Sequence, residues 1–364
     1  MKFRSEQLVL ARLRRKLNKS SLAAAIGVTA LTVTNYEKGV HDPKPEMIDR
    51  LSAVLGFPKS FFFRDLGSEP IPVNAASFRA LSRMSASVRD AALAGGELCV
   101  AFNQWTEGLF DLPAIDLPEL DPGIIEPEGA SLMVRSLWGL GNLPIQNVLH
   151  ELEAHGVRVF SLGQQCHELD AFSFWRNNVP YILLGVHKAP ERAIFDLAHE
   201  LGHLILHRNL VRPSGRQEEN EANAFASNFL MPRADIEAQG FRYPTLTQLI
   251  DAKGRWKVST AALAYRLHDL KHISDWEYRE MFKDIAVFLK KSEPKSLPRE
   301  HSVILSTVMS TMRSEGMRRA DIAEAALSTY PADLEEFLTE LTVSSLEGGG
   351  EATETARPIL RLVQ

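Results

Sequence analysis

The stretch IFDLAHELGHLILH, residues 194–207, carries the pattern from which the fold and the chemistry of this chain are inferred. Its apolar residues recur at the spacing of one helix face, so the stretch predicts an amphipathic helix. The same helix holds His199, Glu200 and His203 in the order H-E-x-x-H. Burying an imidazole or a carboxylate without a partner costs free energy, so a helix that serves only to pack in the core would not carry these three residues. The polar face therefore meets either water or a metal ion.

Helical geometry favours the metal ion. Residues four apart lie one above the other on a helix, so His199 and His203 can present ring nitrogens to one ion. Glu200 directly follows the first histidine and is placed to act as general base on a water bound to that ion. Zinc accepts this type of ligand and is the expected metal, with manganese as the alternative. Such a site predicts a metal-dependent hydrolase.

The third ligand that zinc requires is expected from a second amphipathic helix, RQEENEANAFASNFLMP, which begins at residue 216. Within its acidic start, Glu219 shares a helix face with Asn223. We predict that Glu219 is the third metal ligand and that Asn223 hydrogen-bonds the far ring nitrogen of a ligand histidine. The alternative for the acidic residues is a solvated helix start stabilised by the helix dipole. His207 is expected to be a partly buried helix residue rather than a fourth ligand.

Residues 76 to about 270 resemble the ImmA/IrrE metallopeptidase family, and two motifs carry most of the resemblance. These are APERAIFDLAHELGHLILH and ENEANAFASNFLMP, with weaker likeness in GVRVFSL, AFSFWRNNVPYILLGV and KVSTAALAYRL. The resemblance implies a gluzincin-like α/β peptidase with the same three metal ligands and the same general base. Better-known members of the family cleave a helix-turn-helix repressor and thereby switch on mobile-element or DNA-damage genes. Asp196 departs from the family, which commonly has Thr there.

The N-terminal segment is basic, whereas the rest of the chain is acidic. Residues 1–64 hold 12 Lys and Arg against 5 Asp and Glu, a net charge of +7. The remaining 300 residues hold 29 against 41, a net charge of −12. A compact basic segment favours a polyanionic partner such as nucleic acid, and a solvated helix face is the alternative.

Helix and turn signals in this basic segment are typical of a helix-turn-helix. Leucines near helical spacing in QLVLARLRRKL predict a first helix. Ser20 or Ser21 is expected near the start of the next helix, which ends at a sharp turn marked by Gly27. The third helix is expected to begin at Thr29 and to end at Gly39.

Residues 7–57 resemble the Xre (Cro/cI-type) helix-turn-helix family, on the residues SLAAAIGVTALTVTNYEKG and PKPEMIDRLSAVLG. The resemblance implies double-stranded operator DNA as a partner, a recognition helix in the major groove, and a homodimer on a two-fold site. Lys19 and Ala30 depart from the family, which often has Gln at both positions. A bundle used only for protein contacts is the alternative. The candidate DNA contacts are Lys19, Thr29, Ala30, Leu31, Thr32, Thr34, Asn35 and Lys38.

The composition is that of an ordinary globular chain, with 45% hydrophobic and 24% charged residues. It holds no run of 18 apolar residues and begins without the apolar stretch of a secretory signal, so neither a membrane nor export is expected. Cys99 and Cys166 are the only cysteines and lie outside any C-x-x-C spacing, which excludes a disulfide framework and a cysteine zinc site. The expected location is the cytoplasm.

The expected fold class is α+β and mostly helical, because three short β-like runs stand among helical patterns. These runs are residues 157–162, 171–176 and 179–186. A polar, proline-containing linker marks one domain boundary, and the glycine-rich tail is expected to be flexible. The predicted division is 1–65 Xre-type helix-turn-helix domain, 66–75 linker, 76–273 metallopeptidase domain with a small sheet, 274–346 helical C-terminal region and 347–364 flexible tail.

Two functions remain open from the sequence. In the first, a DNA-binding transcriptional regulator carries a zinc-dependent endopeptidase that cleaves a repressor, an antitoxin-like partner or itself, and so controls stress, mobile-element or toxin–antitoxin genes. In the second, the metallopeptidase-like domain of a regulator or antitoxin is a non-cleaving sensor or partner-binding module. A toxin partner fits both, because fused proteins of this family often sit beside toxin-like genes. The group that stabilises an oxyanion is left open among His167, Tyr181, Arg192, Tyr243 and Tyr265.

Overall fold

The computed structural model describes residues 2–67, 70–72, 84–120, 123–163, 166–185, 187–208, 215–288 and 293–342. The predicted linker lies partly outside these residues and the predicted tail wholly outside them. The described chain is mostly helical and contains one three-stranded sheet, which confirms the predicted α+β class. No helix of the described residues is long and apolar enough to cross a membrane.

The N-terminal residues form a small helical bundle. Its elements are α1 (Ser5–Arg14), α2 (Lys19–Ile26), α3 (Ala30–Glu37), α4 (Pro45–Leu55) and the short 3₁₀ helix η1 (Lys59–Phe63). Gly27 adopts a φ of +74° at the turn between α2 and α3, where a side chain would strain the backbone. Ser20 and Ser21 lie in the first turn of α2, but the cap itself is Asn18. The Asn18 side-chain oxygen accepts a hydrogen bond from the Ser21 N–H at 2.7 Å.

The sheet consists of β1 (Arg158–Ser161), β2 (Ala171–Arg176) and β3 (Val179–Leu184), which fall within the three predicted runs. β3 lies in the centre, parallel to β1 and antiparallel to β2. Asn177 and Asn178 join β2 to β3, both at positive φ, as tight hairpin turns require. The register pairs Ser173 of β2 with Ile182 of β3. β2 is thus an edge of the described sheet, and Ser173 lies within that edge.

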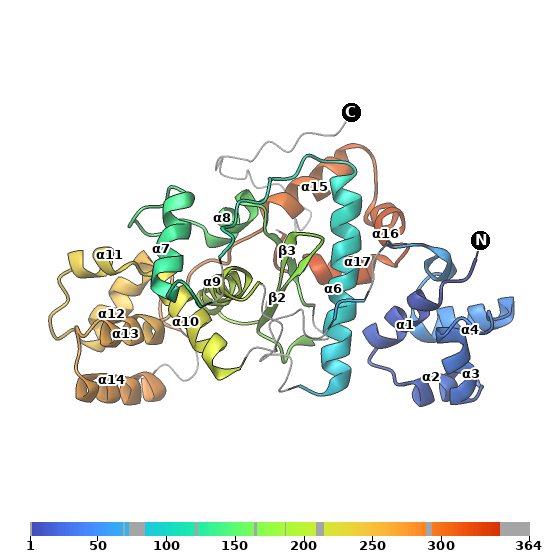
Figure 1. Ribbon diagram of the computed structural model, residues 1–364, viewed down its shortest axis with the longest axis horizontal. Coiled ribbons are helices and arrows are strands. Elements are labelled where there is room, and N and C mark those ends of the chain that lie inside the picture. The colour runs from blue at the N-terminus through green and yellow to red at the C-terminus, as the bar shows by residue number, and fades with distance from the viewer. Residues whose placement is uncertain are drawn as a thin grey trace.

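Two long helices pack beside the sheet and beside each other (Figure 1). α9 (Pro190–Leu206) packs on β2 and β3, and α10 (Arg216–Leu230) packs along α9. The two helices approach closely at Gly202, where a Cβ atom would lie 3.1 Å from the ring of the fully buried Phe225. This packing brings the polar face of α9 to the acidic start of α10.

The remaining helices extend the molecule on both sides of the sheet. Their bounds are α6 (Ala86–Glu107), α7 (Pro127–Leu137), α8 (Val148–Ala154), α11 (Arg233–Ala238), α12 (Leu246–Ala252), the 3₁₀ helix η4 (Lys253–Arg255), α13 (Thr260–Asp269), α14 (Asp275–Phe288), α15 (Val303–Ser314), α16 (Arg319–Leu327) and α17 (Pro331–Leu338). α11–α14 lie at one end of the long axis and the N-terminal bundle at the other (Figure 1). α14 packs on α12 and α13, so these contacts cross the domain boundary predicted after residue 273. The predicted division into domains remains a prediction.

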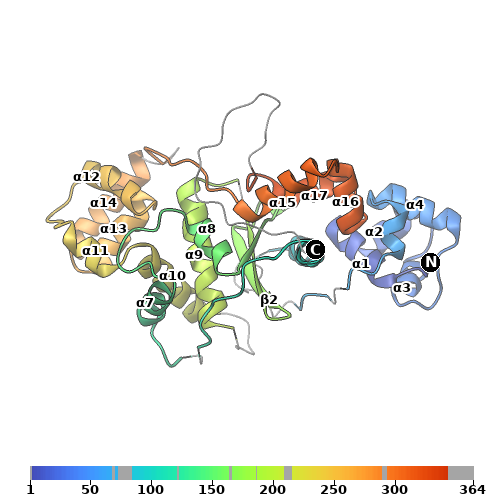
Figure 2. The ribbon, with the colours of Figure 1, turned by 90° about the horizontal axis from the view of Figure 1, so that it is seen from above.

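The C-terminal helices lead from the sheet to the N-terminal bundle (Figure 2): α15 lies beside the sheet, and α16 and α17 lie between the sheet and the bundle. α17 contacts β1, and α16 packs on α6, against which α1 also packs. Arg15, which ends α1, forms two hydrogen bonds to the Asp333 carboxylate of α17 at 2.7 and 3.0 Å. Arg14 pairs with Glu336 of the same helix, and Arg64 donates to two backbone carbonyls of α16. Charged side chains thus fasten the bundle to the rest of the molecule.

Candidate metal centre and DNA-binding surface

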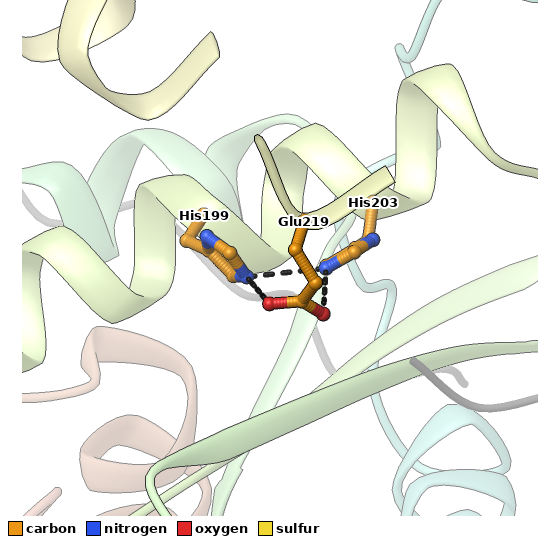
Figure 3. Close-up of side chains that lie close together, drawn as sticks. All are labelled: His199, His203 and Glu219. Carbon is orange, nitrogen blue, oxygen red and sulfur yellow. Dashed lines mark hydrogen bonds and ion pairs between the residues drawn. The ribbon is translucent and has the colours of Figure 1, made fainter. Parts of the chain in front are cut away.

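Three side chains from α9 and α10 converge on one point (Figure 3). The Nε2 atoms of His199 and His203 are 3.1 Å apart, as their spacing along one helix face leads us to expect. Glu219, in the first turn of α10, places one carboxylate oxygen 3.4 Å from His203 Nε2 and the other 3.7 Å from His199 Nε2. Within the described part of the chain, this is the one group of three or more metal-ligating side chains close enough to share an ion.

The contact between His199 and Asn223 determines which ring nitrogen of His199 carries the proton. Its Nδ1 is 3.0 Å from the side-chain oxygen of Asn223, which is an acceptor, so Nδ1 carries the proton and donates it. The Nε2 lone pair of His199 is then left facing the Glu219 carboxylate. A lone pair and a negative charge that face one another repel unless a hydrogen-bond donor or a cation lies between them. The cluster is therefore suited to a cation.

The donor set fits a tetrahedral zinc ion. Zinc–ligand distances of about 2.0–2.2 Å place the ligand atoms of a tetrahedron about 3.3–3.6 Å apart. The separations of 3.1, 3.4 and 3.7 Å in the cluster lie close to this range. Three protein ligands leave a fourth position open, which is the arrangement of catalytic rather than structural zinc sites.

Burial favours the form of the histidine that binds a metal. Desolvation, reinforced by the neighbouring His203, lowers the pKa of His199 to about 3. A neutral imidazole is the form that donates a lone pair to a metal ion. The side chain of His199 is 15% exposed, whereas those of His203 and Glu219 are 4% and 11% exposed. The cluster is therefore largely shielded from solvent, with its greatest exposure at His199.

The three glutamates at the start of α10 have separate partners. Glu218 accepts a hydrogen bond from the backbone N–H just before the helix, which is a capping contact. Glu221 lies 2.9 Å from His207 Nε2. Of the three, Glu219 is the one that lies close to both His199 and His203. The acidic start of α10 therefore combines a helix cap, a histidine contact and a candidate ligand.

Glu200 is buried on the side of α9 that meets β2. The Ser173 hydroxyl donates a hydrogen bond to the Glu200 carboxylate at 2.6 Å. One turn earlier, burial raises the pKa of Asp196 to about 6, although Arg192 lies 3.0 Å away and opposes the shift. No motif in the sequence marks Ser173, because its contact with Glu200 depends on how α9 lies across the sheet.

The five candidate oxyanion groups lie in different surroundings. Tyr181 is buried in β3, and its hydroxyl accepts a hydrogen bond from an asparagine of α6. Tyr243, Tyr265 and His167 are exposed. Arg192 is half exposed and lies on α9 itself, two turns before the first metal-facing histidine. Of the five candidates, Arg192 is the one that lies on the same helix as His199 and His203.

α3 presents the side chains expected to meet DNA. Leu31 is 68% exposed and lies in the first turn of the helix. Lys19 has a competing partner, because its Nζ lies 3.2 Å from the Glu37 carboxylate, which also pairs with Arg12. The other exposed candidates are Thr29, Ala30 and Lys38, and the candidates of intermediate exposure are Lys19, Thr32, Thr34 and Asn35.

The threonine hydroxyls of this surface are engaged within α3. Thr29 caps the helix by accepting a hydrogen bond from the Thr32 N–H at 3.2 Å, and the two hydroxyls are 2.9 Å apart. The Thr34 hydroxyl donates to the Ala30 carbonyl at 2.9 Å. These groups stabilise the helix start, while Ala30 and Leu31 leave an apolar surface of the kind that contacts a thymine methyl group.

The fold and the sites define a metallopeptidase-like domain joined to a helix-turn-helix bundle, and two family models match these parts of the chain. Residues 10–62 match the family described as Helix-turn-helix. Residues 152–268 match the peptidase family described as the IrrE N-terminal-like domain. The matches confirm both resemblances inferred from the sequence, in the same order along the chain. No curated protein matches the chain.

The matched segments contain the candidate sites. The first segment includes α3, and the second runs from α8 into α13 and includes the three candidate metal ligands. These similarities support a DNA-binding regulator with a peptidase-type domain.

Proposed function

We propose that this chain is a transcriptional regulator that binds double-stranded operator DNA through α3 and carries a zinc-dependent endopeptidase. Its substrate is a repressor, an antitoxin-like protein or the chain itself, and cleavage controls stress, mobile-element or toxin–antitoxin genes in the cytoplasm. Manganese is the alternative metal. The observation that carries the proposal is the convergence of His199 Nε2, His203 Nε2 and the Glu219 carboxylate.

In this proposal the three converging side chains hold the metal, and Glu200 acts on the attacking water. A bound zinc ion would lower the pKa of water and polarise the peptide carbonyl. Glu200 accepts a proton from the water and delivers it to the leaving amine. The Ser173 hydroxyl, 2.6 Å from the Glu200 carboxylate, orients that group. Asn223 holds the His199 ring through Nδ1.

Elemental analysis of the intact protein and of His199→Ala tests the metal site. We expect about one metal ion per chain, lost in the variant. Glu200→Gln should retain the metal and abolish cleavage when the protein is incubated with the products of neighbouring genes. Cleavage that persists in Glu200→Gln would contradict the assignment of the base. Wild-type protein without metal would contradict the site.

DNA binding by the full chain is tested with Leu31→Glu. The side chain is exposed, so the substitution should leave the fold intact while bringing a negative charge to the phosphates. We expect affinity for duplexes selected from a randomised pool to fall at least about tenfold. Leu132→Glu, at an exposed position of α7, is the control and should bind like wild type. Equal affinity of the wild type and Leu31→Glu would place the DNA-binding surface elsewhere. We also propose that the protein binds a two-fold symmetric operator as a homodimer.

A regulator that senses metal without cleaving is the second candidate, because the DNA-binding bundle is fastened to the metal-carrying part of the chain. α17 contacts β1 and holds Arg15 through Asp333. In this candidate, Zn²⁺ changes DNA affinity in the wild type and in Glu200→Gln alike. Cleavage by the wild type alone would favour the endopeptidase.

A further inference from the structure

His203 has a hydrogen-bonding partner outside the group of converging donor atoms. His207, one turn further along α9 and at its C-terminal cap, places Nδ1 2.9 Å from Nδ1 of His203. Nε2 of His207 is in turn 2.9 Å from the Glu221 carboxylate on α10. The His207 side chain is only 8% exposed, so water competes little for these contacts. Three side chains thus form a continuous series that ends at His203.

The geometry permits one arrangement of protons when His203 binds a metal. Nε2 of His203 then donates its lone pair to the ion, so its proton is on Nδ1. Two Nδ1 atoms 2.9 Å apart need one donor and one acceptor, so Nδ1 of His207 accepts. The proton of His207 is therefore on Nε2, which donates to Glu221. Each hydrogen bond in the series then has one donor and one acceptor: His203 donates to His207, and His207 donates to Glu221.

We infer that His207 and Glu221 are positioning residues for His203, which hold its ring so that Nε2 faces the metal position. The inference rests on the proposed metal site. Asn223 makes the corresponding contact with the Nδ1 of His199, so each ligand histidine is held from its outer side. Contacts of this kind typically change metal affinity by about 10–100-fold.

A packing role for His207 makes the opposite prediction from a positioning role. Phe retains the volume of the ring but has no acceptor for the His203 Nδ1–H. Asn places its Oδ1 where histidine has Nδ1, so it retains the acceptor but fills less space. Positioning therefore predicts higher metal affinity for His207→Asn than for His207→Phe. A purely structural role predicts the reverse order.

The experiment measures the affinity of full-length, metal-free protein for Zn²⁺ by competition with a chromophoric chelator. We expect His207→Phe to bind about 10–100-fold more weakly than wild type and His207→Asn to retain most of the affinity. Glu221→Gln retains an oxygen acceptor and should bind more tightly than Glu221→Leu. His155→Phe is the matched control and should bind like wild type. It also replaces a histidine at a helix C-cap beside a carboxylate.

The possible outcomes separate this inference from the metal site on which it rests. Wild-type affinity in His207→Phe, or weaker binding by His207→Asn than by His207→Phe, overturns the inference. Wild-type protein that binds no Zn²⁺ contradicts the metal site itself. Thermal unfolding of each metal-free variant shows whether it folds. If His207→Phe does not fold, the test uses the two variants of the partly exposed Glu221 instead. Equal Zn²⁺ affinities of Glu221→Gln and Glu221→Leu would then overturn the inference.

Discussion

Glu153, near the end of α8, shows how burial changes the chemistry of a single carboxyl group. Its side chain accepts hydrogen bonds from the Ser302 hydroxyl and from the Val303 and Ile304 N–H groups at the start of α15. Desolvation outweighs these contacts and raises the pKa of Glu153 from 4.5 to about 7. The folded chain therefore binds this proton more tightly than the unfolded chain. The resulting stability is complete below about pH 4.5 and is lost as the pH rises through about 7.

Glu153→Gln removes the titrating group and retains an oxygen acceptor for the two N–H groups. The free energy of unfolding of the wild type should fall as the pH rises from about 5 to about 8. We expect this fall to be smaller in the variant, by up to about 3 kcal/mol. Thermal unfolding at both pH values measures the difference. Glu151→Gln, on the more exposed side of α8, is the control and should retain the pH dependence of the wild type. An unchanged pH dependence in Glu153→Gln would contradict the prediction.

At the scale of elements, the pairing of α9 with α10 determines whether the donor atoms meet. One helix supplies the two histidines and the other supplies Glu219, so the separation of the helices sets their distances. Glycine inside a helix costs about 1 kcal/mol relative to alanine. Gly202 is explained by packing, because a Cβ atom there would lie 3.1 Å from the Phe225 ring.

Gly202→Ala is therefore expected to destabilise the protein, although alanine is the better helix former. Crowding against Phe225 should cost about 1–3 kcal/mol and weaken Zn²⁺ binding, because α10 moves outward with Glu219. Denaturant unfolding and zinc titration measure the two effects. Gly254→Ala is the control, because an added Cβ there meets nothing within 4 Å. A gain in stability for Gly202→Ala would show that the two helices are not closely packed.

The start of α2 provides a second test at this scale. Asn18→Ala removes the side-chain oxygen that accepts the Ser21 N–H, and should cost about 1 kcal/mol. Ser20→Ala lies inside the first turn and should cost much less, even though serine is also a common capping residue. Unfolding free energies of the two variants measure the difference. Equal losses would argue against Asn18 as the cap.

At the scale of the whole molecule, the C-terminal helices connect the helix-turn-helix bundle to the part of the chain that holds the candidate metal ligands. Arg15 donates to the Leu55 and Gly56 carbonyls at the end of α4 as well as to Asp333 of α17. The Asp333 side chain is 5% exposed, so the pair is partly shielded from water. Removing the charge of Asp333 therefore weakens the docking while leaving the bonds within the bundle in place.

Asp333→Asn is expected to loosen the bundle from α17. The loss of a charged hydrogen-bond partner should cost roughly 1.5–3 kcal/mol and speed amide hydrogen exchange in α1. Asp321→Asn is the matched control, because Asp321 occupies the same position in the first turn of α16 but pairs with the neighbouring Arg318. Its variant should leave exchange in α1 unchanged. Equal protection of α1 in all three proteins would contradict the docking role.

Much of the metal cluster could be predicted from the sequence, because its geometry is largely local. The helical period places His199 and His203 on one face, and the same period pairs Glu219 with Asn223. The three strands followed from short β-like runs between turn signals. The meeting of the two helices was inferred from ligand chemistry, since zinc requires a further ligand.

The sequence by itself determined the helices, the strands and the residues that share a face, because these depend on spacing along the chain and on backbone geometry. The tertiary structure alone decided three contacts between distant elements that no sequence motif indicates. These are the contacts of Ser173 with Glu200, His207 with Glu221, and Arg15 with Asp333. The last pair is separated by 318 residues. Such contacts depend on how packed elements lie against one another, and local periodicity holds no information about that.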